Sequence, residues 1–169
     1  QDFIITVSNT NDTPVLASIA DPSSVLEDGD NITVSVTPTD VDVGASLIVT
    51  VSTNNNSLFP SVDWSPDTAA SNVERIITLN PADNQNGTAL VTVSVTDGSE
   101  SVSQQFTATV TAVNDIPVIS SVPDASAVED VSYSYTLTAS DVDVGDVLSI
   151  SGTYPVSWLT LVDNGNGSA

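Results

Sequence analysis

The chain contains 169 residues, 40% of them apolar, which is enough for a hydrophobic core and argues against intrinsic disorder. Its 22 Asp and Glu residues face one cationic residue, Arg75, so the formal net charge is −21 and predicts repulsion from nucleic acids and anionic membranes. The absence of Cys, of His and of any apolar run of roughly 18 residues argues against disulfides, imidazole or thiolate metal sites and direct membrane insertion.

The first segment of the chain returns later in the sequence. Residues 1–15 (QDFIITVSNTNDTPV) align with residues 104–118 (QQFTATVTAVNDIPV), VLEDG at 25–29 aligns with AVEDV at 127–131, and DVDVG occurs at both 40–44 and 141–145. The offsets of 103, 102 and 101 residues indicate a repeating unit of about a hundred residues. We expect residues 1–8 to be the last strand of a preceding repeat, 9–112 a complete domain, and 113–169 the N-terminal part of a second, incomplete domain.

The complete domain shows the pattern of a β-sandwich. Apolar residues alternate with polar ones, turn residues separate the runs, and no helix-length amphipathic stretch occurs. The expected strands, in chain order, lie near residues 14–20, 31–38, 46–52, 58–64, 73–79, 89–96 and 102–112. Strands that alternate in direction and are joined by short turns predict an all-β sandwich.

Alternating strand directions sort the acidic loops to two ends of this sandwich. The loops expected at the first end carry Asn11, Asp12, Asp40, Asp42 and Asp97. The loops expected at the other end carry Glu27, Asp28, Asp83, Asn84, Asn114 and Asp115. The second DVDVG motif would bring Asp141 and Asp143 to that same junction.

These carboxylates favour a hard divalent cation. Two carboxylates of an extended Asp-x-Asp lie on one side of the chain and repel each other by somewhat under about 1 kcal/mol in water. Ca²⁺ accepts about six to eight oxygen ligands in flexible geometry and removes that repulsion. Mg²⁺ is the weaker alternative, because it tolerates irregular oxygen cages poorly. The lack of His and Cys argues against zinc, copper and iron.

The motifs resemble tandem cadherin-like repeats of bacterial surface and secreted proteins, including the dystroglycan-type variety. The resemblance covers essentially the whole chain and rests on N-D-x-P-V in both linkers, the Glu in the first turn, D-x-D-x-G, and T-D-G at 96–98. It implies Greek-key, Ig-like sandwiches joined end to end, with Ca²⁺ between successive repeats. It assigns one calcium junction to Asn11, Asp12, Asp40, Asp42 and Asp97, and a second to Glu27, Asn114, Asp115, Asp141 and Asp143.

The chain departs from this family in its linkers. The family pattern D-x-N-D-N has Asn9 or Ala112 at its first position here, and Thr13 or Ile116 at its last. Fewer ligands imply one or two ions per junction rather than three, with dissociation constants near ~10⁻⁴ to 10⁻³ M. Asp146, which has no acidic counterpart at Ala45, is expected to be a solvated loop residue.

We therefore expect a calcium-stiffened extender or adhesive module of a large extracellular or cell-surface bacterial protein. Its partners would be neighbouring repeats of the same polypeptide and cell-surface, polysaccharide or homophilic contacts. The alternative is a polysaccharide-binding module attached to a secreted carbohydrate-active enzyme, with a stacking platform drawn from Phe59, Trp64, Tyr133, Tyr135, Tyr154 and Trp158. Core packing is the competing role for these aromatics, and we assign Phe3 and Phe106 to it. With no His, Cys or Lys to activate a nucleophile, we expect no enzyme.

Overall fold

The computed structural model describes residues 2–123, 126–153 and 156–169. The chain divides into two compact units, Gln1–Val113 and Asn114–Ala169. All regular elements in the described ranges are β-strands, so the all-β prediction is confirmed. Among these residues no helix is long and apolar enough to cross a membrane. The end-to-end arrangement of sandwiches stays a prediction.

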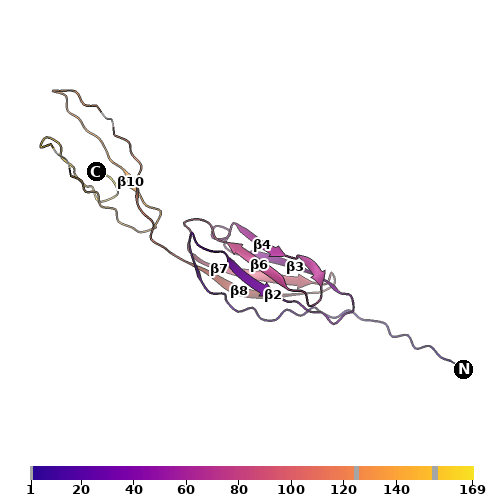
Figure 1. Cartoon of the computed structure of the whole chain (residues 1–169). Coiled ribbons are helices and arrows are strands. Elements are labelled where there is room, and N and C mark those ends of the chain that lie inside the picture. Colours follow the sequence, from indigo (N-terminus) through magenta and orange to yellow (C-terminus); the bar gives the residue numbers. More distant parts are fainter. Residues whose placement is uncertain (1, 124–125, 154–155) are drawn as a thin grey trace. The chain divides into compact units, whose positions relative to one another are not determined.

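Two sheets build the first unit (Figure 1). The larger sheet has the order β1-β8-β7-β3-β5, formed by Val25–Leu26, Ser101–Thr111, Gly87–Thr96, Ser46–Thr53 and Thr68–Ala70. The smaller sheet has the order β2-β6-β4, formed by Ile32–Val36, Arg75–Asn80 and Ser61–Ser65. All neighbours pair antiparallel except β1 and β8, which are parallel.

The hydrophobic core lies between these sheets. In β7 every second side chain is buried, and Val91, Val93 and Val95 are fully enclosed. Ile77 and Leu79 face them from β6 of the other sheet with no exposed surface. Because side chains of a strand alternate between its two faces, this period-two pattern gives each sheet one apolar face and one face toward water.

Six of the expected strands correspond to β2, β3, β4, β6, β7 and β8, but the one at 14–20 is wrong. In that segment only Val15 forms a bridge, with Thr39, through N–H···O bonds of 2.7 and 3.0 Å. Further along, the Asp21 carboxylate accepts the backbone N–H of Thr107 at 2.6 Å. A side chain therefore occupies a β8 donor that a paired strand would have used. Strands β1 and β5 were not predicted.

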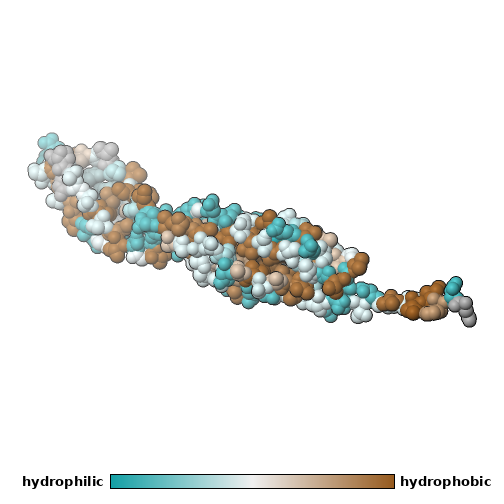
Figure 2. Space-filling view, turned by 60° about the horizontal axis from the view of Figure 1, so that its bottom comes forward, coloured by the Kyte–Doolittle hydropathy of each residue, from teal (hydrophilic) through white to brown (hydrophobic). Residues whose placement is uncertain are grey.

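The assignment of Phe3 to the core is also wrong for this chain. Residues 2–13 form no strand, and the tail side chains Phe3, Ile4, Ile5 and Val7 are between 74% and 92% exposed. Figure 2 shows this hydrophobic surface along the N-terminal tail. Its counterpart Phe106 is 2% exposed, because β8 is paired with β7 and covered by the other sheet. The tail pairs with no strand in the described part of the chain.

The second unit repeats local features of the first. Its strands β9 (Val118–Ile119) and β10 (Ala139–Ser140) pair antiparallel with Val118 opposite Ser140. That pair is the counterpart of the Val15–Thr39 bridge. The DVDVG motifs end on Gly44 and Gly145, whose φ angles of 83° and 107° few other residues adopt. The sequence repeat is therefore also a repeat of local structure.

Arg75, the sole cation of the sequence, is buried at the start of β6 with no exposed surface. Its guanidinium donates to the backbone carbonyls of Leu47 at 3.1 Å, Ala69 at 3.0 Å and Ala70 at 3.4 Å, and also to Val73. No described carboxylate pairs with it. The carbonyl dipoles of β3, β5 and the following turn hold the positive charge instead, so Arg75 fastens the edge of the larger sheet to the smaller one.

Replacing Arg75 should destabilise the first unit strongly. Arg75→Met keeps an unbranched stem but leaves buried carbonyls without donors, at about 1–3 kcal/mol for each group left unsatisfied. Urea unfolding followed by Trp64 fluorescence in a Trp158→Phe background should show a loss of about 3 kcal/mol or more. The stability of Arg75→Lys should lie between those of the parent and Arg75→Met, because the lysine ammonium group has three donors but lacks the planar guanidinium geometry. A Met variant as stable as the parent would contradict this role.

Candidate metal centre

Three loops of the first unit meet around the Asp42 carboxylate. Its Oδ2 accepts the backbone N–H of Asp12 at 2.9 Å, and its Oδ1 accepts the side-chain amide of Asn9 at 2.5 Å. The Asn11 amide donates to Asp97 Oδ2 at 2.9 Å in the β7–β8 loop. The structure thus brings together the linker, the β2–β3 loop and the β7–β8 loop, as the alternating strand directions predicted.

Asp40 is oriented by its own loop, and one of its two carboxylate oxygens is buried. Its Oδ1 accepts the backbone N–H of Asp42 at 2.8 Å, and its backbone N–H donates to Ser71 Oγ at 2.8 Å. Its Oδ2 is buried and accepts no hydrogen bond from the described residues. A buried carboxylate oxygen without a donor is costly, so this position favours a cation.

Hydrogen bonds in this loop cluster favour the ionised forms of Asp42 and Asp97. The Asp12 N–H, and then the Asn9 amide, hold the pKa of Asp42 below its ordinary value, against the opposing effects of burial and the nearby charge of Asp97. The N–H groups of Glu100 and Ser99 and the Asn11 amide likewise lower the pKa of Asp97. Arg75 is occupied by carbonyls, so protein cations do not neutralise this charge.

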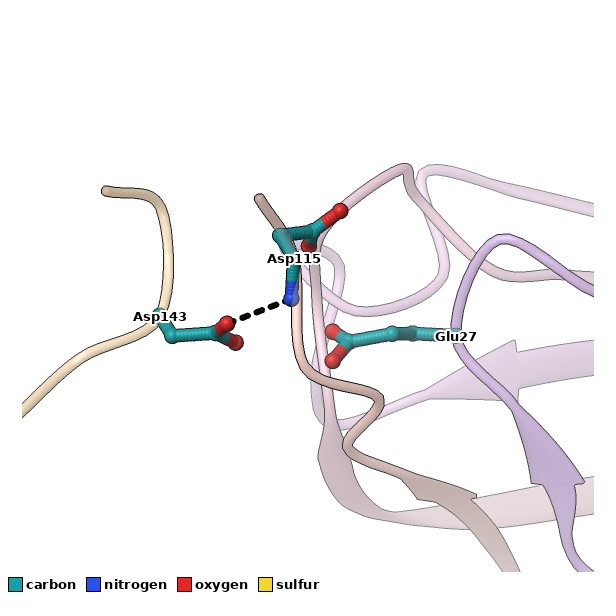
Figure 3. A group of neighbouring side chains, drawn as sticks. All are labelled: Glu27, Asp115 and Asp143. Carbon is teal, nitrogen blue, oxygen red and sulfur yellow. Dashed lines mark hydrogen bonds between the residues drawn. The ribbon is translucent and has the colours of Figure 1, made fainter. Parts of the chain in front are cut away.

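The same bonds recur in the second unit. The Asp143 N–H donates to Asp141 Oδ1 at 3.0 Å, as Asp42 does to Asp40. The Asp115 N–H donates to Asp143 Oδ2 at 2.6 Å (Figure 3), as Asp12 does to Asp42. The Asn114 amide donates to the carbonyl of the next residue, as the Asn11 amide does. Two copies of the motif therefore orient their carboxylates in the same way.

Asp146 belongs to this second group of acids. It is exposed, as expected for a loop residue. One of its carboxylate oxygens nevertheless lies within 4.8 Å of an oxygen of Asp141 and one of Asp143. Its counterpart in the first unit is Ala45, so the second loop offers one carboxylate more. The spacing Asp-x-Asp-x-x-Asp is the sequence pattern from which this third carboxylate could have been predicted.

Glu27 lies at the other end of the first unit and is only 3% exposed. Its Oε1 accepts the backbone N–H of Val113 at 2.8 Å, and its Oε2 accepts the Asn86 amide at 3.2 Å. Beside it, Asp28 accepts the Asn84 N–H at 2.8 Å. The first turn, the β6–β7 loop and the end of β8 therefore meet as predicted. Asn86 was missed, because Asn86-Gly87 also fits an ordinary turn.

No protein-family model matches the chain. The search of curated proteins also found no match. Similar solved structures include the ASH/PapD-like domain 7 of human CEP192, with 8% identity over 67% of this chain and 96% of that one and a TM-score of 0.44. Titin domains Z1Z2 in complex with telethonin share 17% identity over 67% of this chain and 55% of that one, with a TM-score of 0.44. Domains 1–6 of surface layer protein SbsC share 20% identity over 87% of this chain and 19% of that one, with a TM-score of 0.41.

These TM-scores, all below 0.5, establish neither a family nor a function. The relation to cadherin-like repeats therefore rests on the sequence motifs alone.

Asp40→Asn should stabilise the first unit slightly when no divalent cation is present. The amide oxygen can still accept the Asp42 N–H, while one of several neighbouring negative charges is removed. In EGTA we expect a urea midpoint about 0.3 M higher than that of the parent. High salt should reduce the difference by screening the charges. The exposed Asp30→Asn, with the same change in net charge, is the control. A loss of stability in EGTA would show that the Asp40 carboxylate is stabilising without a cation.

Proposed function

We propose that this chain is a Ca²⁺-binding β-sandwich module that acts as an extender or adhesive segment of a large extracellular or cell-surface protein. The observation that carries the proposal is the recurrence of one carboxylate arrangement, with the same hydrogen bonds, in both units. Acids that were only solvated would need no common orientation. Because Arg75 is bound to backbone carbonyls, the negative charge of these aspartates would be neutralised by a cation from solution.

The donor set fits Ca²⁺ in its chemistry. At the first loop cluster, carboxylates of Asp12, Asp40, Asp42 and Asp97 and the amide oxygen of Asn11 are the residues that would hold the ion. Among these ligands, Asp40 Oδ2 is buried and accepts no hydrogen bond from the described residues, so it is free to bind a cation. An all-oxygen set without imidazole or thiolate suits a hard cation of flexible coordination. In the second unit the corresponding residues are Asp115, Asp141 and Asp143, with Asp146 in addition.

The proposed stiffening would act on the backbone of the linker, to which these groups are bonded. Glu27 accepts the N–H of Val113, and Asp143 accepts the N–H of Asp115, two residues further along the chain. We propose that Glu27, Asn114, Asp115, Asp141 and Asp143 share Ca²⁺ at this linker. The ion would replace repulsion between acids by attraction to one centre. Removal of Ca²⁺ would then free the linker before it unfolds either unit.

Two double variants separate the two sites. Asp141→Asn with Asp143→Asn should abolish the Ca²⁺-dependent change in small-angle scattering, and should leave the binding heat of the first site. Asp40→Asn with Asp42→Asn should remove that heat and keep the change in scattering. Asp2→Asn with Asp30→Asn matches the change in charge and should preserve both signals. Parent protein that shows neither heat nor altered scattering between EGTA and several mM Ca²⁺ would refute the function.

An exposed tryptophan favours polysaccharide binding as a second candidate. Trp158 is 70% exposed and lines a cavity of about 660 Å³ with residues 127–133 and 159–160 of the second unit. Tyr133 and the acids Glu129 and Asp130 lie in the same lining, so an aromatic surface and hydroxyl acceptors occur together. Phe59, by contrast, is buried, and the Trp64 indole donates to the Val49 carbonyl at 2.9 Å. Tyr154 lies outside the described residues.

Retention on insoluble neutral glycans tests this candidate. If Trp158 stacks on sugar rings, Trp158→Ala should reduce retention about tenfold, and EGTA should leave it unchanged. Trp64→Phe is the control, because it alters a core aromatic and not the cavity. Equal retention of the parent and Trp158→Ala proteins would exclude the cavity as a glycan site. Anionic glycans should be retained least, given the net charge of −21.

A further inference from the structure

The first linker, residues 9–13, is attached to its sandwich although it contains no strand. The Asn9 amide and the Asp12 N–H both donate to the Asp42 carboxylate, at 2.5 and 2.9 Å. The Asn11 amide donates to Asp97 at 2.9 Å, and the Thr13 hydroxyl donates to the Glu100 carboxylate. Each of these contacts ends on an acid of the first unit, so the linker supplies donors to carboxylates that otherwise repel one another.

An asparagine side chain beside such a carboxylate can act in two ways. Its NH₂ group donates to the acid when no cation is near, and its carbonyl oxygen can ligate a cation after the side chain rotates. An aspartate at position 9, as in the linker pattern of cadherin-like repeats, could only ligate the cation. Asn9 and Asn11 can therefore take over part of the neutralising role of a cation when none is present.

The second linker, residues 112–116, lacks two of these donors. With the offset of 103 residues, Asn9 corresponds to Ala112 and Thr13 to Ile116, and neither replacement has a side-chain donor. Asn11 and Asp12 are kept as Asn114 and Asp115. The backbone N–H of Asp115 still donates to Asp143, as the Asp12 N–H does to Asp42. The two linkers thus share the metal-binding motif and differ in the side chains that could replace the ion.

We infer that the two linkers differ in their dependence on calcium, and that Asn9 and Thr13 are the positioning residues that cause the difference. The first linker keeps its attachment to the sandwich without Ca²⁺, whereas the second depends on Ca²⁺ for an equally firm attachment. The inference rests on the proposed calcium function and deepens it. An array of such modules would combine constitutively ordered linkers with calcium-controlled ones, according to the residues at these two positions.

The amide protons of Asp12 and Asp115 are equivalent reporters, because each donates to the second aspartate of a DVDVG motif. Hydrogen exchange resolved by NMR should be slow for both in Ca²⁺. In EGTA the Asp115 amide should exchange roughly fivefold faster and the Asp12 amide should change little, since about 1 kcal/mol per hydrogen bond corresponds to that factor. Equal acceleration of both amides in EGTA would overturn the inference.

Reciprocal variants test the cause. Asn9→Ala should make the Asp12 amide respond to EGTA, and Ala112→Asn, which introduces the missing amide, should reduce the response of Asp115. Thr10→Ala, at an exposed neighbouring position, is the control and should change neither reporter. If Asn9→Ala leaves Asp12 exchange in EGTA unchanged, Asn9 has no such role.

The failure of the calcium function is distinguishable from the failure of this inference. Absence of both binding heat and altered scattering with Ca²⁺ refutes the calcium function. In that case the linkers cannot differ in calcium dependence, but the exchange rates in EGTA still decide whether Asn9 is a positioning residue: slower exchange at Asp12 than at Asp115, lost in Asn9→Ala, supports that role, and equal rates overturn it. Asn9→Asp adds a further check, because it should loosen the linker in EGTA and tighten Ca²⁺ binding.

Discussion

Negative charge that the protein itself does not neutralise is the constraint on which the rest of this structure depends. The sequence has one cationic side chain, and the fold uses it inside the sandwich, where Arg75 binds backbone carbonyls. Every acidic loop must therefore be stabilised by backbone N–H groups, by polar side chains, or by water and ions from solution. The carboxylate of Asp42 accepts a backbone N–H and an amide side chain, and that of Asp143 accepts a backbone N–H.

A carboxylate in such a loop can accept a hydrogen bond from a backbone N–H and still be able to ligate a metal ion. An N–H group fixes the direction of a carboxylate without neutralising its charge, as the Asp42 N–H does for Asp40 and the Asp12 N–H does for Asp42. The loop can therefore be preorganised without an ion, which would reduce the ordering cost of the Ca²⁺ binding proposed above. The same preorganisation is costly without an ion, because Asp40 Oδ2 is buried and has no partner in the described chain.

The parts of the fold that depend on long-range alternation could be predicted from the sequence, and the parts that depend on single contacts could not. Strand β7 buries every second residue from Ala89 to Val95, and β8 does so from Phe106 to Val110, so their period is visible. Strands β1 and β5 have two and three residues, too few to show a period. Strand alternation also predicted which loops meet. The donors Asn9 and Asn86 and the burial of Arg75 depend on tertiary contacts that no local pattern reveals.

The parallel pairing of β1 with β8 determines how the first unit would carry mechanical load. The chain reaches β1 from the N-terminal linker and leaves through the C-terminal end of β8, and the two strands run in the same direction. Tension applied to the two ends of the unit would therefore slide these strands past each other and strain their bonds together, rather than peel them apart one by one. The Glu27 N–H to Thr111 carbonyl bond of 3.0 Å and the Thr111 hydroxyl to Val25 carbonyl bond of 3.0 Å lie directly across that shear plane.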